Sequence, residues 1–139
     1  ASVARRVHEL CPLVEVGVRS LSAEERDFIR DARVPVCFRP SGSREPFDPS
    51  DDVLKSLSPT VYISIDLDVL DPSLMSAVGT PEPGGMRWEE LTGLLRTVAS
   101  ERRIVGFDIT ELSPLEGPEA CAYIAAKLTY KLIGYATLS

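Results

Sequence analysis

The pattern of apolar and polar positions divides this chain into alternating strands and helices. Four short apolar runs, most of them rich in β-branched residues, predict buried strands at Leu13–Val18, Val34–Phe38, Thr60–Ile65 and Ile104–Ile109. Apolar residues at helical spacing, together with helix-start signals, predict helices at Val3–Leu10, 22–32, Ser50–Leu57, Trp88–Ser100 and Glu119–Tyr135. This alternation indicates an α/β fold with three layers (α/β/α), in which a mainly parallel sheet lies between helices.

Local signals support two of these helices and one loop. Ser22-Ala-Glu-Glu25 has the form of a capping box, in which the serine and the glutamate each bond a free backbone amide. The last helix is expected to bury the apolar face Cys121, Ile124, Leu128, Leu132 and Tyr135. Arg39–Pro49 is rich in Pro, Ser and Gly, which predicts a surface loop within the domain.

Composition narrows the class of protein. With 139 residues, positions 1–139 are expected to form a single domain. The net charge of −6 argues against a nucleic-acid surface, and the chain shows neither a membrane-spanning run nor a signal peptide. Its three cysteines, Cys11, Cys37 and Cys121, are predicted to be reduced and buried, as in a cytoplasmic protein. Because the chain begins with Ala1, a fragment or a processed product is also expected.

The candidate chemistry lies where the third strand ends. Asp66 and Asp68 are two residues apart, so in a strand both would project from one face. A bare D-x-D is common and by itself favours a structural or solvated role, but these carboxylates close an apolar strand. Side by side they repel each other, and a hard divalent cation such as Mg²⁺ or Mn²⁺ would remove the conflict. Asp71, by contrast, is expected to begin an Asp-Pro turn.

Two further segments should meet this strand end. The loop Gly79–Gly85 contains two prolines, so it is either a rigid turn or a pocket wall. Glu111 follows the fourth strand, and the carboxyl ends of parallel strands share one edge, so it is interpreted as a pocket carboxylate. Asp108 points to the opposite face and is taken as structural. His8, the only histidine, is taken as a partly exposed helical residue.

Three motifs together resemble those of the ureohydrolase family of arginases and agmatinases. They are Ser64–Pro72 (SIDLDVLDP), Gly79–Gly85 (GTPEPGG) and Gly106–Pro114 (GFDITELSP). The loop is most similar to the agmatinase branch, and Val14–Ser20 also resembles a family strand. The likeness covers essentially the whole chain and implies an arginase-like fold with a binuclear manganese centre.

The resemblance also implies roles for individual residues. Asp66 and Asp68 match a late pair of metal ligands, and Glu111 matches the catalytic, substrate-binding carboxylate that holds the guanidinium. Thr80 matches a substrate-binding threonine. Two Mn²⁺ ions would lower the pKa of a bridging water, and the resulting hydroxide would attack the guanidinium carbon. The products would be urea and an amine.

One departure from the family pattern is large. The family takes its other ligands from Gly-Gly-Asp-His and Asp-Ala-His-x-Asp segments, and neither occurs in this sequence. Because two aspartates cannot fill the shells of two ions, the chain resembles the C-terminal portion of a ureohydrolase and is expected to be inactive alone. In family members a strand from the other portion lies inside the sheet, so its absence would leave unpaired edges.

Alternatives remain open at this point. A degenerate, non-catalytic subunit would explain the missing histidines, whereas the retained Asp66, Asp68 and Glu111 argue against it. A metal and nucleotide-sugar enzyme would explain the D-x-D alone. Agmatine, converted to putrescine in polyamine biosynthesis, is the expected substrate among several guanidino compounds. The resemblance further implies a homo-oligomer, and the charge and the lack of a membrane-spanning run predict neither nucleic-acid nor membrane partners.

Overall fold

The computed structural model describes residues 2–39 and 45–138, so part of the predicted loop Arg39–Pro49 lies outside the described residues. Helices and strands alternate along the chain, as predicted. In order they are α1 (Ser2–His8), β1 (Glu15–Val18), α2 (Ala23–Ala32), β2 (Val36–Phe38), α3 (Ser50–Ser56), β3 (Thr60–Asp66), the 3₁₀ turn η1 (Leu67–Val69), α4 (Trp88–Glu101), β4 (Arg103–Thr110) and α5 (Glu119–Leu138). The α/β class is therefore confirmed.

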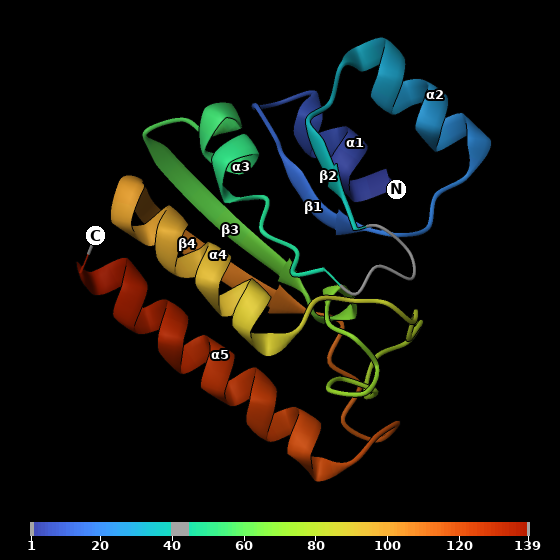
Figure 1. The fold of residues 1–139 in the computed structure, drawn as a ribbon, viewed down its shortest axis with the longest axis vertical. Helices are drawn as coiled ribbons and strands as arrows, with labels where there is room; N and C mark the ends of the chain where they lie inside the picture. Colours follow the sequence, from blue (N-terminus) through green and yellow to red (C-terminus); the bar gives the residue numbers. More distant parts are fainter. Residues whose placement is uncertain (1, 40–44, 139) are drawn as a thin grey trace.

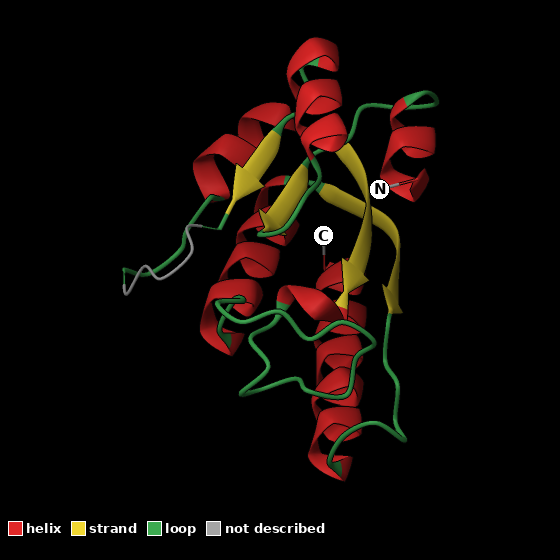
Figure 2. Cartoon of the chain, turned by 90° about the vertical axis from the view of Figure 1, so that its right-hand side faces the viewer, coloured by secondary structure: helices red, strands yellow, loops and turns green. Residues whose placement is uncertain are grey.

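The strands form two separate parallel pairs in the described part of the chain, not the single sheet that the alternation predicts. β1 pairs with β2 over three residue pairs, and β3 pairs with β4 over seven. Figure 2 shows the two pairs as distinct ribbons of strands. Gly17 interrupts the register of β1 with a positive φ of 82°, and a Cβ there would lie 2.6 Å from Val69 Cγ2. The end of β1 thus packs closely against η1.

The hydrophobic core lies between the β3–β4 pair and the helices α4 and α5. Alternate residues of β3, Val61 and Ile65, are buried, whereas their neighbours on the opposite face are exposed. Leu128 and Leu132 of α5 are fully buried, and α4 buries Leu91, Thr92, Leu94, Leu95 and Val98. In Figure 1, α4 and α5 run side by side across this pair of strands. This packed sheet supports the segments that follow β3 and β4.

A buried ion pair joins the end of β2 to α4, the helix that packs on the second strand pair. Arg39, the first residue after β2, lies with its Nη1 2.9 Å from Oε2 of Glu90 in the first turn of α4. Both side chains are only 6–7% exposed. Glu90 Oε1 also accepts from the backbone amide of Phe47, so it holds the segment before α3 against α4. These bonds, with those from Arg39 and the Arg87 amide, keep the pKa of Glu90 low despite its burial.

Two local expectations have opposite outcomes. The capping box at Ser22 and Glu25 is confirmed, with reciprocal bonds of 3.1 and 2.7 Å. The expectation that all three cysteines are buried is wrong. Cys121 is buried and Cys37 half-buried, but Cys11 is exposed because it lies in the turn that follows α1.

Candidate functional site

Asp66 and Asp68 lie close together, but not by the strand alternation that the sequence suggested. β3 ends at Asp66, and Asp68 belongs to the 3₁₀ turn η1. The reason is local: Oδ1 of Asp66 accepts a 2.8 Å bond from the amide of Asp68, and such side-chain bonds compete with extended structure. The chain therefore turns at once after the strand. Both carboxylates stay at its carboxyl end.

Asp68 is held from the side of the glycine-rich loop. Oγ1 of Thr80 donates a 2.7 Å hydrogen bond to Oδ2 of Asp68. Oδ1 of Asp68 is buried and has no hydrogen-bond partner among the described residues. A buried carboxylate oxygen is costly unless a donor or a cation compensates it, so this atom has capacity for a further partner. The two residues predicted separately as a metal ligand and a substrate-side threonine are thus brought into contact.

The loop between η1 and α4 is closed at its base by backbone bonds. Met86 donates to Val69 and accepts from Asp71, at 2.7 and 3.0 Å. Asp71 begins the predicted turn: its carboxylate accepts from Ser73 and, at 2.9 Å, from the amide of Gly84. A Cβ at Gly85 would collide with the backbone of the segment that begins the turn, so the close approach requires glycine. The loop is thus closed at its base, and its Thr80 lies against Asp68.

Glu111 reaches the same place from β4. It is the first residue after that strand, is exposed, and has a positive φ of 68°, which is rare for a residue with a side chain. A Cβ at Gly79 would lie 4.0 Å from Glu111 Oε2, so the carboxylate lies against the start of the loop. The amide of Ser113 donates to Ala77 at 2.8 Å and fixes the two segments together.

The electrostatics of Asp66 agree with this convergence of acidic groups. Burial raises the pKa of Asp66, and the nearby carboxylates of Asp68 and Glu111 raise it further. The hydrogen bond from the Asp68 amide and the positive charge of Arg19 act in the opposite direction. A cation bound beside these groups would relieve the repulsion that favours the protonated form.

Asp108, taken as structural from the sequence, is engaged by its neighbours on the sheet. It lies opposite Ser64, whose Oγ donates to Asp108 Oδ1 at 2.8 Å. A hydrogen bond to Asp108 raises the pKa of the Tyr62 hydroxyl. Its carboxylate is therefore occupied, whereas one oxygen of Asp68 is not.

The donor atoms suit a hard divalent cation, but they form an incomplete set. Asp66 and Asp68 offer carboxylate oxygens, and the unpartnered Oδ1 of Asp68 is the atom best placed to gain a cation. Within residues 2–39 and 45–138, no cluster of three or more His, Cys, Asp or Glu side chains could hold a metal ion. The described residues thus fit a partial coordination shell.

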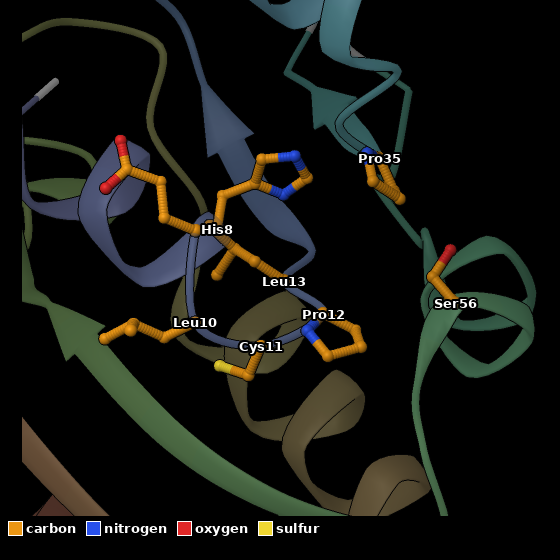
Figure 3. A pocket seen from close by; sticks show the side chains of 8 residues that line it. His8, Leu10, Cys11, Pro12, Leu13, Pro35 and Ser56 are labelled. Atoms are coloured by element: carbon orange, nitrogen blue, oxygen red, sulfur yellow. The ribbon is translucent and has the colours of Figure 1, made fainter.

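The surface hollows lie elsewhere. One of about 460 Å³ is lined by residues of the α1 end, the turn after it, Pro35 and Ser56, as Figure 3 shows. A second, of about 520 Å³, lies along β2 and the start of α3. Neither is lined by Asp66, Asp68, Thr80 or Glu111. The candidate site is thus marked by its polar side chains and not by either of these hollows.

His8 lines the first hollow and is partly exposed, in agreement with its expected role as an ordinary helical residue. Its ring packs edge-on against Phe28, with centroids 6.1 Å apart. None of the helices among the described residues is long and apolar enough to cross a membrane.

Sequence reasoning missed one residue of this region, Arg19. Its guanidinium donates to main-chain oxygens of η1 and of the glycine-rich loop. The available signal was its position directly after an apolar strand, at the edge where the acidic residues were expected. A charged residue at that place has a structural or chemical partner more often than not.

Comparison with known proteins gives a consistent answer. Residues 1–134 match the sequence model of the arginase family. The N(1)-aminopropylagmatine ureohydrolase of Thermus thermophilus is 44% identical over 94% of this chain and 44% of its own length. The protein of the same name from Synechocystis sp. is 36% identical over 97% of this chain and 44% of its own length.

Solved structures show the same fold. The agmatine ureohydrolase of Thermoplasma volcanium superposes with a TM-score of 0.76 at 33% identity, covering 97% of this chain and 46% of that protein. Helicobacter pylori arginase gives a TM-score of 0.75 at 27% identity, covering 89% and 44%. The chain therefore spans less than half the length of these relatives.

Proposed function

This chain belongs to the arginase family, and from that membership we propose that it supplies one part of a manganese-dependent ureohydrolase site. The observation that carries the proposal is the convergence of Asp66, Asp68, Thr80 and Glu111 at the carboxyl ends of β3 and β4. The contact between Thr80 and Asp68, at 2.7 Å, joins the metal side of the site to its substrate side. Family membership leaves no role for the nucleotide-sugar alternative.

Each residue has a distinct task in the proposed reaction. Asp66 and Asp68 would hold Mn²⁺ through their carboxylate oxygens. Bound manganese lowers the pKa of a coordinated water, so that hydroxide is available near neutral pH. Glu111 would bind the planar guanidinium by charge-assisted hydrogen bonds and fix its orientation at the site. The rigid loop Gly79–Gly85 would form the wall that limits water and substrate movement.

We propose agmatine or an N-substituted agmatine as the substrate, with urea and the corresponding amine as products. The support is the activity for which the relatives from Thermus thermophilus and Synechocystis sp. are named. The chain by itself should release no urea, because its described residues supply too few ligands. The cytoplasmic location and the homo-oligomer also remain proposals.

The decisive experiment is a chimera. The matched segment of the Thermus thermophilus relative is replaced by this chain, and urea release from agmatine and N(1)-aminopropylagmatine is measured with Mn²⁺. We expect activity from the chimera and none from the 139-residue chain alone. In the chimera, Asp68→Asn and Glu111→Gln should each reduce kcat/KM by about 100-fold or more, which corresponds to roughly 3 kcal/mol.

Asp108→Asn is the matched control, because its carboxylate is already bonded to Ser64. It should leave kcat/KM within a few-fold. A folded chimera without activity would contradict the proposal and favour a degenerate subunit. Urea release from the isolated chain would contradict the claim that its site is incomplete.

A further inference from the structure

Arg19 is the first residue after β1, and its side chain reaches three segments of the candidate site. Nη2 donates to the carbonyl oxygens of Asp68, at 2.7 Å, and Glu82, at 2.8 Å. Nη1 donates to those of Gly17 and Val69, at 3.3 and 3.4 Å. All four acceptors are main-chain carbonyls, so these hydrogen bonds of the guanidinium go to the backbone of the site.

The positions of these acceptors determine what the contacts fix. Asp68 and Val69 contribute consecutive peptide groups of η1, and their orientation sets the direction in which the Asp68 side chain projects. Glu82 lies two residues after Thr80 in the glycine-rich loop. One guanidinium nitrogen therefore bonds both the turn that carries Asp68 and the loop that carries Thr80, whose side chains meet at 2.7 Å.

We infer that Arg19 is a positioning residue, which holds the metal-side Asp68 and the substrate-side Thr80 in register. The roles of Asp68 and Thr80 in this inference rest on the proposed function, whereas the contacts of Arg19 do not. Arginine suits the task because its planar group presents five donors in a fixed fork, whereas lysine presents donors from a single point. Lysine would keep the charge, but with three donors on one nitrogen it could not reproduce all four of these bonds.

Arg39 provides the contrast within the same strand pair. It follows β2 as Arg19 follows β1, but its guanidinium pairs with the buried carboxylate of Glu90. Arg39 thereby joins two structural elements away from the acidic cluster. A role in general stability is expected for Arg39, and a local role at the site for Arg19.

The test uses the full 139-residue chain and its variants Arg19→Lys, Arg19→Gln and Arg39→Lys. Hydrogen exchange of single amides is followed by NMR, without metal or substrate. The reporters are the Leu70 and Met86 amides, which bond Leu67 and Val69. Both Arg19 variants should raise the exchange rates of these two amides. The increase should be about ten times larger than the increase at the amides of α5. Arg39→Lys should change all regions together.

Two results would overturn the inference. Normal protection in Arg19→Lys would show that charge alone suffices, and equal acceleration in α5 would show a general structural role. If the Arg19 variants do not fold, the same measurement on the chain without substitutions tests the inference. In that chain the Nη protons of Arg19 should exchange more slowly than those of the exposed Arg103. Equal rates would contradict the fork of bonds. Since no urea is measured, failure of this inference and failure of the proposed function remain separate.

Discussion

The two strand pairs of this chain differ in length, packing and chemistry. β3 and β4 pair over seven residues and are covered by α4 and α5, which contribute eight of the eighteen residues of the core cluster. β1 and β2 pair over three, Gly17 is their only buried residue, and the neighbouring helix α2 buries no residue fully. The carboxylates lie on the well-packed pair, and the weaker pair contributes a single arginine. Site geometry is thus built where the scaffold is most rigid.

The largest expected effect tests this difference in packing. Leu128→Ala in α5 removes a fully buried side chain and should lower the free energy of unfolding by about 3 kcal/mol. Ile29→Ala in α2 removes a partly exposed one and should cost about 1 kcal/mol. Urea-induced unfolding followed by circular dichroism measures both. Equal losses of stability would show that α5, on the β3–β4 pair, and α2, beside the β1–β2 pair, are equally well packed.

The sequence predicts the helices and strands of both pairs, but not how the strands pair. Strand and helix positions follow from local periodicity, and every predicted element exists with ends shifted by a few residues. The separation of the sheets does not follow from local pattern, because β1 and β3 are both apolar runs and pairing depends on distant contacts. The family resemblance was needed to expect unpaired edges, and the two separate pairs agree with it.

An intermediate effect concerns two similar turns, one after η1 and one before α3. Asp71 and Asp48 each accept bonds from a serine two residues later, and these bonds lower the pKa of both carboxyls. Asp71 also accepts from Gly84 in the site loop. Asp71→Asn should destabilise the chain by about 1 kcal/mol at pH 7, a value reduced for partial exposure. Asp48→Asn should cost less.

The sign of the pH dependence follows from the direction of the shifts. A carboxyl whose pKa is lowered by folding stabilises the native state above its unfolded pKa, about 3.9, and this contribution is lost as pH falls through the lower folded pKa. The difference between wild type and Asp71→Asn should therefore shrink below about pH 4. Thermal unfolding from about pH 2 to pH 7 measures it. A constant difference would show that the charge of Asp71 is irrelevant.

The sequence predicted that the residues of the candidate site lie near one another better than it predicted their geometry. Thr80 contacts Asp68, and Glu111 lies beside Gly79, as their places in a glycine-rich loop and after an apolar strand suggested. The roles of these residues stay predictions. The 3₁₀ turn at Asp68 was not foreseen, since it depends on one bond from its own amide to Asp66. Arg19 was missed because three of its four partners are backbone carbonyls 49 to 63 residues away, which no local motif records.

The smallest expected effect compares two strained residues. Glu111 and Arg33 are the non-glycine residues with positive φ in the described chain, at 68° and 54°. Arg33 ends α2, whereas Glu111 presents its carboxylate beside Gly79. Asparagine tolerates this backbone conformation better, so Glu111→Asn and Arg33→Asn should each raise stability by up to about 1 kcal/mol, measured by thermal unfolding.

The two variants should differ in function. In the chimera, Glu111→Asn should lose urea release while gaining stability, and Arg33→Asn should gain stability at unchanged kcat/KM. Glu111→Gln separates the two contributions, because it removes the charge and keeps the strain. A stabilised and fully active Glu111→Asn variant would remove Glu111 from the site. A stabilised but inactive Glu111→Asn variant would show that the proposed site requires the carboxylate at this strained position.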